Sequence, residues 1–105
     1  MDASPLQCNL DALSPTERAH HAATLHKLGE KILERKELPD GYAYRFAWES
    51  DILEQFVEWI PLERACCPFL RFSIEVEPGN AVWLRLTGSA EVKEFIRFEF
   101  QKLGL

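Results

Sequence analysis

Hydrophobic residues recur every three or four positions in three stretches of the chain, which is the spacing of an amphipathic helix. The first stretch runs from Ser14 to about Lys36, the second follows Ser50, and the third follows Ser89. The first stretch opens with Ser14-Pro15-Thr16-Glu17, a capping box with proline at the first helical position. The pattern predicts three helices.

Three other stretches alternate apolar residues with polar or small ones, as a strand with one buried face does. They are Tyr42–Trp48, Leu70–Glu77 and Val82–Thr87, and Pro78-Gly79-Asn80 predicts a hairpin between the last two. The order α-β-α-β-β-α predicts an α+β fold with helices packed on a three-stranded antiparallel or mixed sheet. The sheet is similar to a split βαβ unit, with the third strand between the first two. Where the first helix docks stays open.

Composition narrows the class of protein. With 105 residues the chain is expected to form a single domain, 1–105, in which residues 1–9 are the loosest part. A net charge of −5 argues against nucleic acid or an anionic membrane as a partner. The first residues lack the pattern of a signal peptide, and three irregularly spaced cysteines do not make a disulfide framework. We therefore expect a cytoplasmic protein in a reducing compartment.

The chemically distinctive segment is Ala65-Cys66-Cys67-Pro68-Phe69, at the end of the second helix. Glu63 precedes the two cysteines by three and four positions and so shares their face of a helix. Cys67 is expected to continue the apolar stripe of this helix and to point inward. These residues predict a site for zinc or another soft metal or metalloid ion, with Cys8 as a third sulfur ligand and Glu63 completing the set. His21 could join if the first helix packs near Cys67.

Two other functions stay open. In the first, Cys66 and Cys67 are only small buried side chains of a structural or protein-interaction domain, and a homodimer is then the expected partner. Adjacent cysteines favour this alternative, because their side chains diverge from a regular helix. In the second, one thiol acts in a redox enzyme with Cys8 or its neighbour as the resolving thiol. The negative end of a helix disfavours a thiolate there, so an enzyme is less favoured than a binding protein.

Several segments resemble a group of small uncharacterised bacterial proteins. They are Cys8–Leu13, Leu38–Tyr42, Glu63–Phe72 and Trp83–Gly88, and the Glu-Arg-x-Cys-Cys-Pro-Phe block is the most specific of them. Similar segments occur beside metal-responsive regulators of the MerR type. The resemblance carries no activity, but it implies that Cys8, Glu63, Cys66 and Cys67 belong to one signature. The expected role is a metal carrier, sensor or resistance accessory that binds the ion without catalysis.

Overall fold

The computed structural model describes the chain from residue 8 to residue 102, and its side chains as far as residue 100. In chain order the elements are a short 3-10 helix η1 (Leu10–Ala12), α1 (Pro15–Glu30), β1 (Ile32–Leu38), β2 (Gly41–Phe46), α2 (Ile52–Cys66), β3 (Arg71–Glu77), β4 (Ala81–Thr87) and α3 (Ala90–Lys102). The strands form one antiparallel sheet in the order β1-β2-β4-β3. The α+β class is confirmed, but the sheet described has four strands where the sequence predicts three.

The extra strand comes from the segment that was expected to end the first helix. Helix α1 begins as predicted, because the Ser14 hydroxyl accepts from the Glu17 amide at 3.1 Å and the Glu17 carboxylate accepts from the Ser14 amide at 2.8 Å. It ends at Glu30, with the poor helix former Gly29 in its last turn. Residues 32–38 form β1, so the predicted element order is wrong and becomes α-β-β-α-β-β-α.

Strand β1 has no recognisable strand pattern in the sequence, because it lies at an edge of the sheet and buries little of either face. Its residues are mostly Leu, Glu, Arg and Lys, which favour helices, and its five central positions are exposed. Charged side chains on an edge strand also oppose pairing with another chain. Pairing with β2 across the short turn Pro39-Asp40 holds the segment in the sheet.

One face of the sheet is apolar and carries the core. Opposed pairs across β2 and β4 are Tyr42 with Leu86, Tyr44 with Leu84, and Phe46 with Val82. Strand β4 lies between β2 and β3, as the split βαβ arrangement predicts. Gly79 forms the β3–β4 turn at a φ of 91°, a backbone conformation that glycine adopts without a steric penalty.

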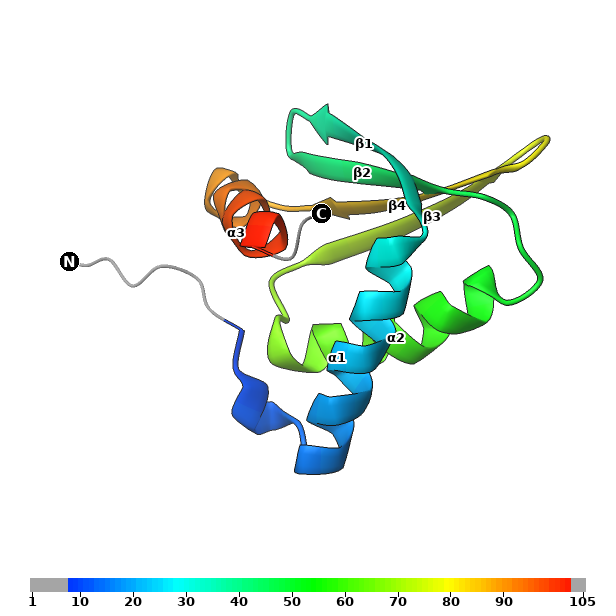
Figure 1. Cartoon of the computed structure of the whole chain (residues 1–105). Helices are drawn as coiled ribbons and strands as arrows, with labels where there is room; N and C mark the ends of the chain where they lie inside the picture. The colour runs from blue at the N-terminus through cyan, green and yellow to red at the C-terminus, as the bar shows by residue number, and fades with distance from the viewer. Residues whose placement is uncertain (1–7, 103–105) are drawn as a thin grey trace.

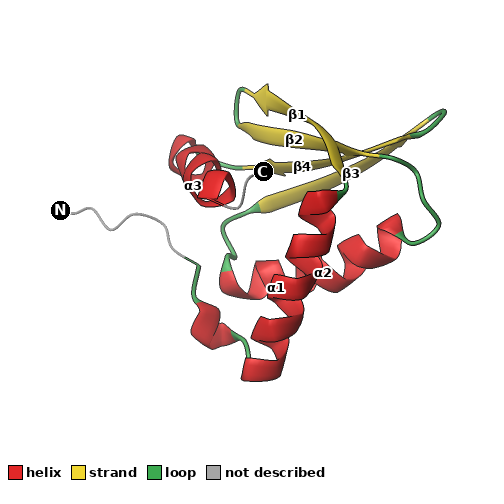
Figure 2. Cartoon of the chain, in the orientation of Figure 1, coloured by secondary structure: helices red, strands yellow, loops and turns green. Residues whose placement is uncertain are grey.

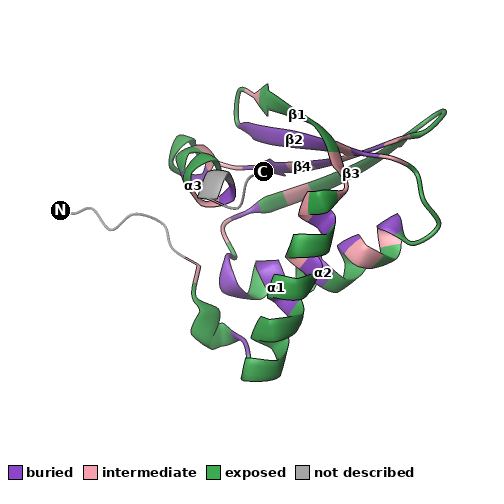
Figure 3. Cartoon of the chain, in the orientation of Figure 1, coloured by how far each residue is buried: buried purple, intermediate pink, exposed green. Residues whose placement is uncertain are grey.

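Two of the three long helices in the described chain pack against each other, and the third packs on the sheet (Figures 1 and 2). Helices α1 and α2 pack together below the sheet, and α3 contacts β2 and β4. Figure 3 shows that buried positions gather in β2, in β4 and on the facing sides of the helices, whereas β1 and β3 are largely exposed. Within residues 8–102, the helices lack the combination of length and apolarity needed to cross a bilayer.

The buried face of α2 carries the glutamate and the first of the two cysteines that the sequence singled out. It runs through Ile52, Phe56, Trp59, Glu63 and Cys66. This face continues to Cys66, whereas the sequence suggested Cys67; Cys67 caps the helix and is buried as well. The helix continues through Pro61, whose side chain is exposed. A glutamate on the apolar face is the feature that needs a chemical explanation, because burial of an unpaired charge is costly.

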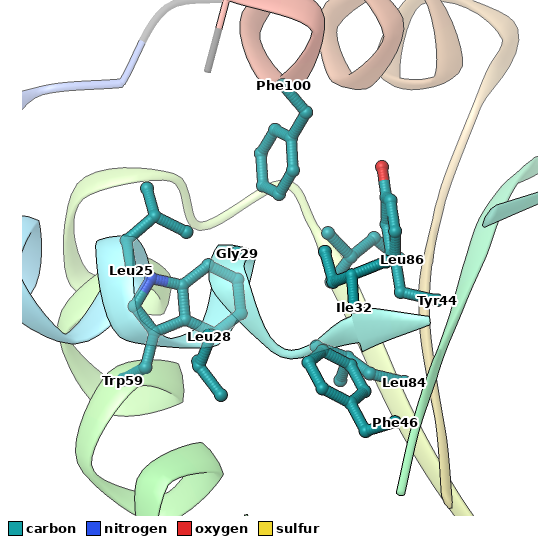
Figure 4. A pocket seen from close by; sticks show the side chains of 10 residues that line it. All are labelled: Leu25, Leu28, Gly29, Ile32, Tyr44, Phe46, Trp59, Leu84, Leu86 and Phe100. Carbon is teal, nitrogen blue, oxygen red and sulfur yellow. The ribbon is translucent and has the colours of Figure 1, made fainter. Parts of the chain in front are cut away.

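Tyr44 and Trp59 border a small apolar cavity between the sheet and the helices α1, α2 and α3 (Figure 4). The Tyr44 hydroxyl and the Trp59 indole N–H are both buried, and neither has a hydrogen-bond partner among the described residues. Burial raises the pKa of Tyr44 to about 12, so its phenol is neutral at physiological pH. A buried hydroxyl without a partner loses the hydrogen bonds that water gives it in the unfolded chain.

Tyr44→Phe is therefore expected to raise the free energy of unfolding by about 1 kcal/mol, because it removes an unpaired polar atom and leaves the ring in place. Urea unfolding followed by circular dichroism measures the change. Tyr42→Phe on the same strand is the control. It should not raise the free energy of unfolding, because the Tyr42 hydroxyl is not among the buried polar atoms that lack a partner. A loss of stability in Tyr44→Phe would show that another group satisfies the hydroxyl.

Candidate metal centre

The end of α2 carries the two adjacent cysteines. Cys66 lies on the last turn, and Cys67 leaves the helix with φ −130° and ψ 69° while its amide donates to the Glu63 carbonyl at 2.7 Å. Both side chains are completely buried. Because Cys67 is no longer helical, its sulfur turns back toward that of Cys66, and the two Sγ atoms lie 3.6 Å apart. The divergence expected of two adjacent cysteines on a regular helix does not occur.

The third sulfur belongs to Cys8, the first residue of the described chain. The amide of Asn9 donates to the Cys66 carbonyl at 2.7 Å, and η1 packs against α2. Cys8 is thereby placed beside Cys67, and the structure joins the two in a disulfide with a Cα–Cα distance of 4.6 Å. The sequence predicted that Cys8, Cys66 and Cys67 come together, but it did not predict the bond.

A buried histidine–carboxylate pair lies next to these sulfurs. His21 donates from Nε2 to Oε1 of Glu63 at 2.6 Å, across the contact between α1 and α2. Only 9% of His21 and 3% of Glu63 is exposed, and the His21 ring stacks on Trp59 with centroids 6.4 Å apart. The other two histidines face outward, each near an exposed glutamate: His20 with Glu58 at 3.5 Å and His26 with Glu30 at 3.6 Å.

The other four residues that the sequence nominated as ligands therefore lie around Cys66. With it they form two groups of three, Cys8 with Cys66 and Cys67, and His21 with Glu63 and Cys66, and in each group the possible ligand atoms lie within 4.8 Å of one another. Cys66 belongs to both groups. Thiolates suit soft ions, and mixed nitrogen, oxygen and sulfur ligands suit zinc, so this cluster can hold a metal ion.

The free thiol of the cluster is poorly suited to nucleophilic chemistry. Burial raises the pKa of Cys66 to about 11, and the neighbouring carboxylate of Glu63 adds to the effect. Reactive cysteines instead have a lowered pKa, beside cations or at helix N-termini. Cys66 is a protonated thiol at neutral pH in the metal-free protein, and a bound cation would have to displace its proton.

The stacking of Trp59 on His21 is the part of the site that sequence reasoning missed. Trp59, Glu63 and Cys66 recur at steps of four and three residues, so the helical period itself placed all three on one face.

The fold and the cluster define a small α+β protein with a cysteine-centred set of side chains that could hold a metal ion. No family model, curated protein or solved structure matches the chain.

Proposed function

We propose that the reduced protein binds one soft metal or metalloid ion through Cys8, Cys66 and Cys67. The observation that carries the proposal is the convergence of three sulfurs from two chain segments that lie 59 positions apart. Two of the sulfurs, those of Cys66 and Cys67, are fully buried. Such a position excludes competing water ligands and suits a carrier or sensor that retains its ion without a catalytic step.

The sulfur positions fit a coordination sphere. A tetrahedral ion about 2.3 Å from each sulfur sets neighbouring sulfurs about 3.8 Å apart. The Sγ atoms of Cys66 and Cys67 are already 3.6 Å apart. Cys8 and Cys67 are bonded in the structure, so the bond must be reduced first and their sulfurs must then separate by roughly 2 Å from bonding distance. Cys8, which precedes η1, is the residue best placed to make that movement.

Charge favours a soft ion of high valence. Three thiolates carry a charge of −3, which a trivalent arsenic centre would neutralise and a divalent cadmium or mercuric ion would largely offset. Burial of a nearly neutral centre costs less than burial of a charged one. The position at the C-terminal end of α2, where backbone carbonyls carry partial negative charge, also favours a cation.

The test is a titration of the fully reduced protein with Cd²⁺ in the absence of oxygen, with a phosphine as reductant. Thiolate-to-cadmium absorption and native mass spectrometry should both report one ion per chain. Cys8→Ser, Cys66→Ser and Cys67→Ser should each weaken binding by more than the roughly 10–100-fold that loss of an outer-shell partner costs. His26→Ala changes an exposed histidine outside the cluster and serves as the control. Absence of a cadmium complex in the reduced wild type, or equal binding by the serine variants, would overturn the proposal.

A structural role is the second candidate, and the Cys8–Cys67 bond favours it. Together with the hydrogen bond from Asn9 to Cys66, that bond fastens η1 to the end of α2. A protein that uses its cysteines only in this way should bind no cadmium after reduction and should protect Cys66 from alkylation while folded. A thiol-redox role is less favoured, because the pKa of Cys66 is raised.

A further inference from the structure

We infer that His21, Glu63 and Cys66 form a second cation position, distinct from the three-sulfur position, which takes a divalent ion of the zinc class. This position goes beyond the proposed function, because it needs neither Cys8 nor Cys67 and remains available while those two are joined. Cys66 is the residue that the two positions share.

The burial of the pair is the first argument. His21 and Glu63 come from different helices and meet inside the α1–α2 contact, where Glu63 is 3% exposed. Replacing such a pair with apolar side chains commonly leaves a protein as stable or makes it more stable, so stability alone does not account for a buried pair. A binding role gives this pair a reason to occupy the apolar face of α2.

The geometry is the second argument. Nε2 of His21 faces Oε1 of Glu63 at 2.6 Å, so a cation bound by both atoms would replace the proton that the two share in this hydrogen bond. In a tetrahedral zinc site the ligating nitrogen and oxygen are about 3.3 Å apart. The observed 2.6 Å must therefore open by roughly 0.7 Å, which small side-chain rotations can supply. The Cys66 sulfur lies within 4.8 Å of a ligand atom of each of the other two residues and completes three protein ligands. The fourth position of a tetrahedral zinc site would then be open to water.

The ligand chemistry distinguishes this position from the first. One imidazole, one carboxylate and one thiolate are the three ligand types that zinc accepts in proteins, whereas softer ions favour sulfur alone. A divalent cation, a carboxylate and a thiolate sum to zero charge, which suits the buried surroundings. The second position should therefore select zinc or cobalt over the softer ions.

The oxidised protein provides the cleanest experiment, because its Cys8–Cys67 bond removes two of the three sulfurs from competition. Titration with Co²⁺ should give one tetrahedral cobalt centre per chain, with a weak thiolate charge-transfer band that reports a single sulfur. Zn²⁺ should displace the cobalt and should raise the midpoint of thermal unfolding. The Cys8→Ser, Cys67→Ser double variant should give the same spectrum without any disulfide.

Variants of the three ligands should abolish the signal. Glu63→Gln and His21→Gln keep side-chain hydrogen bonding possible while removing a ligand, and each should lower cobalt affinity at least tenfold. Cys66→Ala should remove the charge-transfer band. The exposed neighbours give a matched control, because Glu58→Gln and His20→Gln alter a similar pair on the outer face of the same two helices. Circular dichroism of each variant separates loss of binding from loss of folding.

Failure here is distinguishable from failure of the proposed function. If the oxidised protein and the double serine variant bind no cobalt, or bind it without a thiolate band, the second position does not exist, whatever the reduced protein does with cadmium. Unchanged cobalt binding by folded His21→Gln would equally overturn the inference. Conversely, cobalt binding by the oxidised protein would support the second position even if the reduced protein does not bind cadmium.

Discussion

Reduction of the Cys8–Cys67 bond is expected to lower the free energy of unfolding by about 4 kcal/mol. The bond spans a sequence separation of 59, and closing a loop of that length removes entropy from the unfolded chain. Domains of this size are usually stable by only about 5–15 kcal/mol, so the loss would be a large share of the total. Urea unfolding of the metal-free protein, with and without reductant and in the presence of a chelator, measures it.

Cys8→Ser under oxidising conditions should reproduce the effect of the reductant, because it removes the same bond. Cys66→Ala keeps the bond and should cost about 1 kcal/mol, a typical value for a buried single substitution. If reductant leaves the urea midpoint unchanged, the bond does not restrain the unfolded chain and the stapling role is contradicted. Recovery of stability when Cd²⁺ is added to the reduced wild type would show that an ion can take over the cross-link.

How far the sequence predicts the fold depends on whether a local pattern coincides with a buried face. The β3–β4 hairpin and the Ser14 capping box were predictable, because the turn residues and the capping side chains act on their own neighbours. Strand β1 was not, because residues 32–38 form an exposed edge and carry no alternating apolar face. Their place in the sheet is determined by backbone pairing with β2, which no side-chain pattern records.

The candidate site divides in the same way. The spacing of Glu63, Cys66 and Cys67 predicted one local group, since positions three and four apart share a helix face. His21 was nominated only on condition that the first helix docked nearby, and that docking depends on the whole fold. Helix α1 packs on α2 and meets the condition. The Cys8–Cys67 pairing could not be derived either, because three cysteines allow three pairings and spacing alone selects none of them.

Removing one member of the buried pair should be as damaging as reducing the disulfide. Glu63→Ala is expected to cost about 3–5 kcal/mol, because it leaves the imidazole of His21 buried without its acceptor and opens a cavity on the apolar face of α2. Glu58→Ala is the matched control on the same helix. The Glu58–His20 pair is 52% exposed on each side, so its loss should cost less than about 1 kcal/mol. Chemical unfolding of the metal-free proteins compares the two.

The decisive variant replaces both partners with apolar residues of similar size, as in His21→Leu with Glu63→Met. Because neither position then carries a buried polar group without its partner, the stability should return to within about 1–2 kcal/mol of the wild type. It should nevertheless bind no cobalt, since two of the three ligands of the second position are gone. A stable double variant without cobalt binding would mean that the pair is not needed for folding, and the reason for a histidine and a glutamate in this core would then be the cation. If Glu63→Ala costs no more than Glu58→Ala, the buried pair contributes nothing that depends on its burial, and that argument fails.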